Sequence, residues 1–244
     1  MKRRTVVLII LCLGAAAGCR ESPTTPSTPT IELSTSSLSF TATMGGASPA
    51  AQGVSIMNSG DDTLNGLAAA ISYTAGQPTG WLSASLSRTT APASMTVSAT
   101  TGSLAAGTYT ATISISSGVA DNSPQTVAVA FLVTGPDLVV SALTATISAT
   151  DYIVSATVTN QGTGDAVGAW VLRFVTPPGG IIGTTDIPYP NAALASGASW
   201  TYSMRWIMSL PTGFTYTFTA TADQTNTIVE SNESNNTLSI QRNW

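Results

Sequence analysis

The sequence predicts an all-β protein made of two tandem antiparallel β-sandwiches, which follow an export signal and a short tether. Apolar residues alternate with Ser and Thr in short runs, as in strands that bury one face. Gly, Pro, Asn and Asp interrupt these runs at short intervals, which favours turns between strands. Charged residues make up only 8% of the chain, against roughly 25% in an average soluble domain. This composition of small and β-branched residues favours sheets over helices.

The N-terminal segment has the order of an export signal. Basic residues at positions 2–4 precede an apolar run from Val6 to Leu13, and the sequence LGAAAGC then ends in Cys19. The run is shorter than the ~20 residues that a membrane-spanning helix needs. The segment resembles a bacterial lipoprotein signal with its lipobox, which implies removal of residues 1–18 and lipid attachment at Cys19. An ordinary secretory signal cut near Ala17 and an uncleaved anchor are the alternatives.

Residues 19–30 follow as a tether rich in Pro and Thr. Pro23, Pro26 and Pro29 recur every third residue among Ser and Thr, and proline favours an extended chain. The tether either lifts the first domain off the membrane or is a disordered linker without a spacing role. Arg20 stands where an Asp would follow the lipidated cysteine, and by resemblance to Gram-negative lipoproteins this implies the outer membrane or cell surface.

Several classes of function lack their central residue. The chain has no histidine, and the part after the signal has no lysine and no cysteine except Cys19. Catalytic triads with a His base, His or Cys zinc sites, P-loops and Schiff-base lysines are therefore excluded. Acidic residues outnumber arginines after the signal, so no basic stripe is present to bind nucleic acid. We expect no enzyme, no disulfide and no nucleic-acid partner.

Residues 31–134 predict the first sandwich. We expect strands at 36–42, 53–58, 67–73, 81–86, 94–99, 108–116 and 124–133. In the sixth, Tyr109 and every second residue to Ile115 are apolar and alternate with Thr or Ser. The seventh repeats this period of two from Val127 to Val133, so both strands should bury one face.

This region resembles a known family. The sequences LSF (38–40), NSG (58–60), GWLS (80–83), LAAGTY (104–109) and SPQTV (123–127) are similar to the BACON-type immunoglobulin-like domain of bacterial surface proteins. The resemblance implies an immunoglobulin-like sandwich and contact with glycans, without supplying a binding residue. Trp81 is the candidate residue for glycan contact, because sugars stack on indole faces. The alternative is that Trp81 anchors the core.

Residues 137–244 predict the second sandwich. Gly135 and Pro136 end the preceding strand, and so short a linker implies a semi-rigid rod. We expect strands at 138–147, 152–160, 167–175, 181–187, 199–208, 215–222 and 237–242. Large residues alternate from Trp200 to Met208 and from Phe214 to Ala222. Such stripes predict a core face rather than an exposed adhesive platform.

The second region also resembles a family. The residues that carry the resemblance are PDLVV (136–140), VTNQGTG (158–164), LASG (194–197), Asp223 and VESNESNN (229–236). The region is similar to the CARDB domain, a cell-adhesion-related domain of bacteria. The resemblance implies an immunoglobulin-like sandwich with a role in adhesion or extracellular assembly.

One cluster has the residue types of a calcium site. Asp223, Glu230, Glu233, Asn235 and Asn236 place five oxygen-bearing side chains close together in sequence, and calcium prefers oxygen ligands. The spacing is not that of an EF-hand. The alternative is a turn whose Asn and Asp side chains bond their own backbone while the carboxylates stay in water.

These observations predict a non-enzymatic lipoprotein of the cell envelope. It would reach the membrane through its lipid and would bind a glycan or a surface protein in adhesion. The alternative is a structural spacer or assembly subunit of an envelope complex. Apart from calcium at the cluster above, we expect no cofactor.

Overall fold

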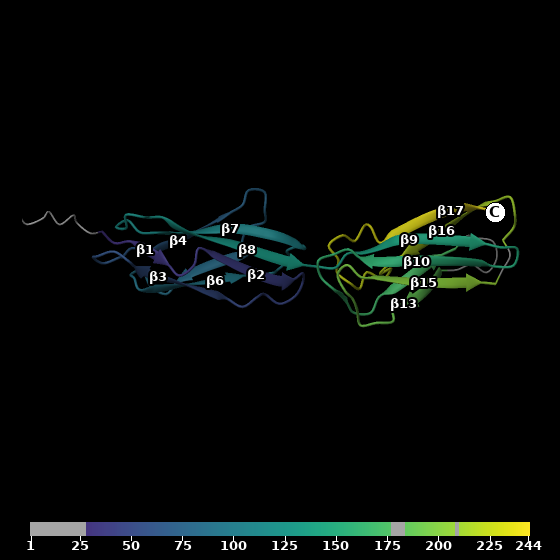
Figure 1. Cartoon of the computed structure of the whole chain (residues 1–244), viewed down its shortest axis with the longest axis horizontal. Helices are drawn as coiled ribbons and strands as arrows, with labels where there is room; N and C mark the ends of the chain where they lie inside the picture. The colour runs from purple at the N-terminus through teal and green to yellow at the C-terminus, as the bar shows by residue number, and fades with distance from the viewer. Residues whose placement is uncertain (1–27, 177–183, 208–209) are drawn as a thin grey trace, which may run out of the picture.

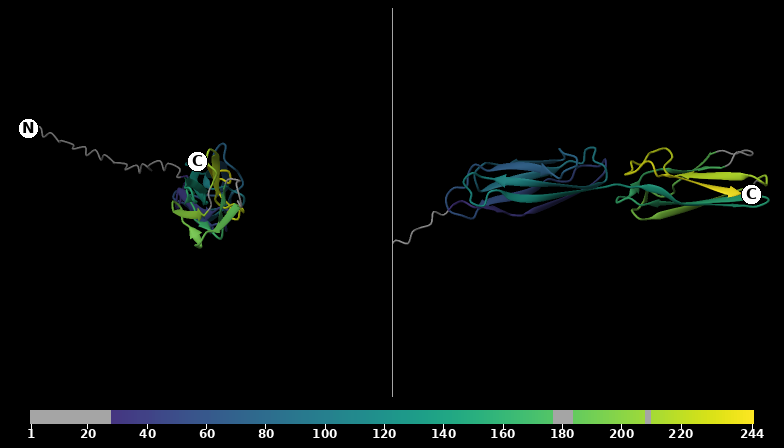
Figure 2. Two further views of the ribbon diagram at one scale, coloured as in Figure 1. Left: turned by 90° about the vertical axis from the view of Figure 1, so that its right-hand side faces the viewer. Right: turned by 90° about the horizontal axis from the view of Figure 1, so that it is seen from above.

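The computed structural model describes residues 28–176, 184–207 and 210–244. Figure 1 shows two β-sandwiches arranged end to end, with the tether side at one end and the C-terminus near the other. The two further views in Figure 2 show the same end-to-end order. In the described ranges, no helix is long and apolar enough to cross a bilayer.

The first sandwich contains two four-stranded sheets. One has the order β1-β3-β6-β5 and the other the order β2-β8-β7-β4. The strands are β1 (Ile31–Leu33), β2 (Ser37–Thr43), β3 (Gln52–Asn58), β4 (Ala68–Tyr73), β5 (Leu82–Leu86), β6 (Ala93–Ala99), β7 (Gly107–Ser116) and β8 (Gln125–Thr134).

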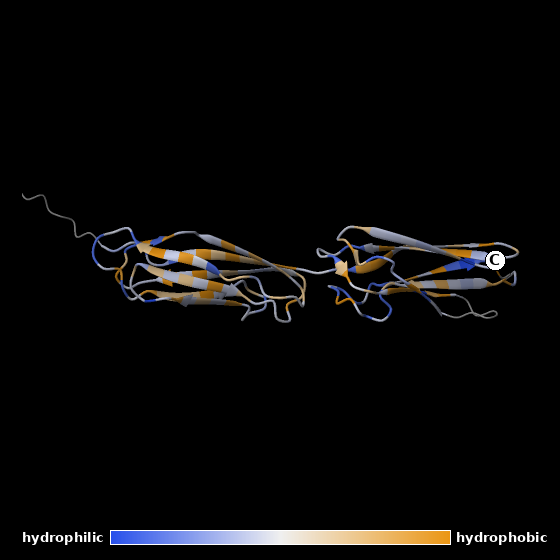
Figure 3. Ribbon diagram, turned by 90° about the horizontal axis from the view of Figure 1, so that it is seen from below, coloured by the Kyte–Doolittle hydropathy of each residue, from blue (hydrophilic) through white to orange (hydrophobic). Residues whose placement is uncertain are grey.

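The core of the first sandwich follows the predicted alternation. Tyr109, Ile113 and Ile115 of β7 are buried, as are Val127 and Phe131 of β8. Figure 3 shows the resulting alternation of hydrophobic and hydrophilic bands along the strands. Two features were not predicted from the sequence. A short strand, β1, precedes the first expected strand, and β2 pairs with β8 in parallel.

The second sandwich packs a three-stranded sheet against a four-stranded one. Their orders are β15-β10-β9 and β13-β12-β16-β17, and β11 pairs with β14 beside them. The strands are β9 (Leu138–Ile147), β10 (Tyr152–Asn160), β11 (Ala166–Val167), β12 (Val171–Val175), β13 (Thr184–Pro188), β14 (Ala193–Leu194), β15 (Ser199–Trp206), β16 (Thr215–Thr221) and β17 (Thr237–Asn243).

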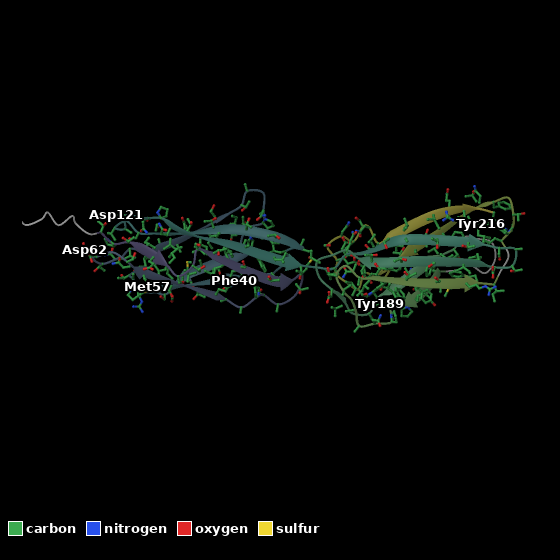
Figure 4. All side chains as sticks on the ribbon, viewed as in Figure 1. Phe40, Met57, Asp62, Asp121, Tyr189 and Tyr216 are labelled. Carbon is green, nitrogen blue, oxygen red and sulfur yellow. The ribbon has the colours of Figure 1, made fainter. Side chains whose placement is uncertain are left out.

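The core of the second sandwich is aromatic. Trp170 lies 4.6 Å from Tyr189, centroid to centroid, in a stacked pair, and Trp200 and Trp206 pack against the same core from β15. Figure 4 shows Tyr189 and Tyr216 toward opposite ends of this domain. The aromatic stripe of β15 is therefore part of the core and not an exposed platform.

Three details of the second sandwich differ from the prediction or lie outside it. The expected strand at 167–175 is interrupted at Gly168, whose φ of +125° is typical of glycine. Phe214 was expected to face the core but is 61% exposed, because it lies in the turn before β16. Met208 and residues 181–183 lie outside the described residues.

Candidate functional site: the joint between the two sandwiches

The linker between the two sandwiches is only three residues long. Strand β8 ends at Thr134 and β9 begins at Leu138. The backbone N–H of Met44 donates to the carbonyl of Thr134 over 2.7 Å, which holds the end of β8 in the first domain. Few free backbone torsions remain between the two cores, so the contacts of Gly135, Pro136 and Asp137 determine how the domains are joined.

Asn160, the last residue of β10, holds the linker from one side. Its Oδ1 accepts from the backbone N–H groups of Asp137 and Gly162, both over 3.1 Å. Its Nδ2 donates to the carbonyls of Gly164 and Leu194, both over 2.9 Å. Asn160 is fully buried, and these four bonds use the whole capacity of its amide. The side chain therefore fixes the start of the second domain to the loop at 160–164.

The same loop contacts the linker backbone directly. Gly164 donates its backbone N–H to the carbonyl of Gly135 over 2.9 Å. A Cβ on Gly162 would lie 2.5 Å from the backbone N of Asp137 and from the carbonyl carbon of Pro136. A Cβ on Gly135 would lie 3.1 Å from the Cβ of Ala106 in the first domain. The glycines of the NQGTG sequence thus permit a close backbone approach at the joint.

The loop at 230–236 holds the linker from the other side. The backbone N–H of Ser231 donates to the carbonyl of Pro136 over 2.8 Å. Asn235 donates from Nδ2 to Oδ1 of Asp137 over 2.9 Å. Glu230 accepts from the backbone N–H of Leu138, the first residue of β9. The linker consequently lies between two loops of the second domain, which together form the joint clamp (residues 160–164 and 230–236).

Glu230 is a buried carboxyl that forms no salt bridge with any described residue. It is 5% exposed, and its Oε1 accepts from Nδ2 of Asn236 over 2.8 Å. Its pKa is raised from 4.5 to about 7, mainly by burial and to a smaller extent by the charges of Glu233 and Asp223. The hydrogen bonds from Leu138 and Asn236 oppose this rise in pKa. The carboxyl in the clamp therefore titrates near neutral pH.

The five calcium candidates are engaged by different partners, and one of them, Asn236, donates from Nδ2 to Oε1 of Glu230. Asp223 accepts from the backbone N–H groups of Thr227 and Ile228, over 3.1 and 2.7 Å. Glu233 accepts from the backbone N–H of Glu230 over 2.7 Å. Asn235 bonds Asp137 of the linker, and Glu230 bonds Leu138 directly after it. Across the described ranges, no group of three or more His, Cys, Asp or Glu side chains is arranged to hold a metal ion.

The alternative to a calcium site, a turn whose carboxylates stay in water, is correct for the turn but wrong for the exposure of Asp223 and Glu230. Asp223 bonds its own loop and has a φ of +42°, as expected for such a turn. However, the sequence interpretation placed the carboxylates in water, whereas Asp223 is 4% exposed and Glu230 is also buried. Their role is to satisfy backbone donors within the fold.

Trp81 is a core residue. Its side chain is 3% exposed, and its ring centroid lies 5.7 Å from those of Tyr73 and Phe131. The proposed stacking of a sugar on the indole face is therefore wrong, because Tyr73, Tyr109 and Phe131 surround the ring. Cys19, the lipidation candidate, lies outside the described residues.

The sequence interpretation missed the residues of the clamp that matter most. Asn160 and Gly162 were identified only as part of a family motif, and Ser231 was not singled out. A signal was present, since NQGTG begins at the last residue of an expected strand, and an Asn side chain at such a position typically bonds the backbone two residues on. Their partner, the linker, could not be identified from local sequence.

A comparison with protein families matches residues 135–240 to CARDB. The second domain is a CARDB domain. Its first matched residue, Gly135, lies in the linker, so the matched region of the CARDB domain includes both the linker and the two loops of the joint clamp. The BACON resemblance of the first domain stays a prediction.

Solved structures offer distant neighbours. A CARDB domain from Pyrococcus furiosus, in complex with di-metal ions, has a TM-score of 0.37 and 20% identity over 45% of this chain and 93% of its own. The class 5 fimbriae chaperone CfaA has a TM-score of 0.29 and 11% identity over 87% of this chain and 98% of its own. The secreted serine protease VesC from Vibrio cholerae has a TM-score of 0.31 and 8% identity over 88% of this chain and 49% of its own. No curated protein matches the sequence.

Proposed function

We propose that this protein is a non-enzymatic lipoprotein of the cell envelope that acts in cell-surface adhesion by binding a glycan or a protein. The observation that carries the proposal is the joint clamp. A linker of three residues, bonded on both sides, makes a rod of two small domains. Such a rod presents its far end at a defined distance from the tether. The CARDB domain supports an adhesive role.

Attachment would occur through lipid at Cys19, most simply at the outer membrane or cell surface. The tether at 19–30 would then separate the first sandwich from the bilayer. The lack of histidine and of lysine after the signal supports a role in binding instead of catalysis.

Fractionation and mass spectrometry test the attachment. We expect the native protein in the envelope fraction, with a diacylglycerol on an N-terminal Cys19. Cells that carry Cys19→Ser should release the protein and attach less to a glycan-coated or matrix-coated surface. A mature N-terminus at an unmodified residue, recovery from the cytosol, or equal attachment by the two strains would contradict the proposal.

A structural spacer or assembly subunit is the second candidate, and the outer face of the β15-β10-β9 sheet favours it. There, Thr157 bonds Thr201 and Ser155 bonds Ser203, each over 2.8 Å. This face carries hydroxyls, and β15 is an edge strand of the sheet that could pair with another chain. A pull-down from envelope extract discriminates the candidates. One stoichiometric protein partner and no glycan binding would support assembly.

A further inference from the structure

The far end of the second sandwich exposes two large apolar side chains. Ile207 follows the end of β15 and Phe214 precedes the start of β16, at the end of the domain away from the linker. Ile207 is 83% exposed and Phe214 61%. The backbone N–H of Trp244 donates to the carbonyl of Phe214 over 3.0 Å and fixes the backbone there. The side chain of Phe214 therefore faces water from a position that is held in place.

The same end has a small positive charge. Arg205 of β15 is 61% exposed and forms an ion pair with Asp151. Arg242 is exposed on β17, where it pairs with Tyr216 close to the start of β16. Two arginines and one aspartate leave this end with a net charge of +1 among the described residues. Five of the other acidic residues of the domain lie at the joint, namely Asp137, Asp165, Asp223, Glu230 and Glu233.

The opposite end of the molecule has the reverse charge. Figure 4 shows Met57, Asp62 and Asp121 at the tether end of the first sandwich. Met57 is 48% exposed, and Val119 in the loop before β8 is 44% exposed. The backbone N–H of Asp121 donates to the carbonyl of Pro29 over 3.1 Å, so this loop is held as well. Among the described residues, four acids and one arginine lie at this end and give a net charge of −3: Glu32, Asp61, Asp62, Asp121 and Arg88.

The two ends are complementary to each other. Single exposed apolar side chains are common on soluble proteins, but here each end combines two of them with a charge opposite to that of the other end. Opposite charges favour encounter and orient the partners, and the apolar side chains add area that leaves water on contact. A second copy of the same chain supplies both surfaces. They are the far-end surface (Arg205, Ile207, Phe214 and Arg242) and the tether-end surface (Met57, Asp61, Asp62, Val119 and Asp121).

We propose that the far-end surface of one copy binds the tether-end surface of a second copy. The contact is heterologous, because it joins two different surfaces, and every added copy leaves one surface of each kind free. Each end offers only a few apolar side chains, so one contact is weak and gains strength where many copies are displayed together. This inference rests on the proposed adhesive function and names its protein partner as another copy of this chain.

Sedimentation equilibrium of the mature chain carrying Cys19→Ser tests the contact. We expect the weight-average mass to rise above that of the monomer between about 10 µM and about 1 mM chain, as for a small interface. The rise should be smaller in about 500 mM than in about 20 mM NaCl, because salt screens exposed charges. Phe214→Ser should weaken association about tenfold. The control is Val167→Ser, which changes a side chain that is 69% exposed at the joint end of the same domain, and it should associate as wild type does.

Charge reversal tests which surfaces meet. Arg242→Asp and Asp61→Arg should each weaken association about tenfold, because like charges then face each other in every contact. An equimolar mixture of the two variants should associate again. The reversed far end of one variant attracts the reversed tether end of the other, and the unchanged ends also match. Because Asp61, Phe214 and Arg242 are exposed, each variant should melt at the wild-type temperature, which separates a lost contact from a lost fold.

Two results would overturn the proposal. One is a chain that stays monomeric up to about 1 mM in low salt, or a mixture that associates no better than either variant alone. The other is binding to vesicles of anionic lipid that Phe214→Ser abolishes, without self-association, because the far-end surface would then belong to a lipid partner. In both cases the adhesive function is judged separately, by whether cells that carry Cys19→Ser lose attachment to a coated surface.

Discussion

Glu230 should make the stability of the CARDB domain fall as the pH rises through neutrality. Its folded pKa is about 7, against an ordinary value of 4.5. A carboxyl whose pKa is raised on folding binds its proton more tightly in the folded state. Its contribution to stability is therefore fully present below about pH 4.5 and is lost as the pH rises through 7. The difference of about 2.5 units corresponds to about 3 kcal/mol.

Urea unfolding of the mature chain between pH 5 and pH 9 measures this effect. Tryptophan fluorescence mainly reports the CARDB domain, because Trp81 is the only one of the five tryptophans in the first domain. The wild-type free energy of unfolding should fall by about 2.5 kcal/mol between these limits, because part of the contribution is already lost at pH 5, and Glu230→Gln should remove most of that slope. Glu32→Gln, on the exposed side of β1, should not. A wild-type stability that is flat or rises with pH, or an unchanged slope in Glu230→Gln, would refute the reasoning.

Three further predictions concern the joint clamp and the calcium candidates. Gly162→Ala should destabilise the joint by about 2 kcal/mol or displace the linker, because the added Cβ would meet backbone atoms. As the control, Gly118→Ala should leave the melting temperature unchanged, because a Cβ there meets no atom within 4 Å. Asn160→Ala should cost about 3 kcal/mol in urea unfolding by leaving buried donors and acceptors unpaired, and exposed Asn232→Ala should cost far less; equal costs would contradict the role of Asn160. Millimolar calcium should leave the melting temperature unchanged, because the candidate carboxylates already accept backbone hydrogen bonds, and a clear rise would establish a site.

Much of the fold could be predicted because side-chain alternation is local. The residues from Tyr109 to Ile115 and from Val127 to Val133 reveal their inward faces in sequence, and the strands of both domains lie close to the predicted ranges. The parallel pairing of β2 with β8 could not be predicted, since it joins segments far apart in the chain. The exposure of Phe214 was missed because the period of two continues into the turn before β16.

The candidate site was less accessible to sequence reasoning. Glu230 and Asp223 have the residue types of metal ligands, but which donor meets each oxygen depends on tertiary contacts. Leu138 and Glu230 are 92 residues apart in sequence and bond only in the folded domain. Trp81 likewise could be assigned either to the core or to a ligand until its neighbours were known. Motifs therefore located the loops of the clamp, and the structure supplied their partner.

The proposed rod requires that the two sandwiches move as one body. Residual dipolar couplings of the mature chain carrying Cys19→Ser measure this directly, because each domain reports its own alignment in the same sample. The joint clamp predicts that both domains share one alignment tensor, and that Gly162→Ala separates the two tensors. Two different tensors in the wild-type chain would contradict the rod.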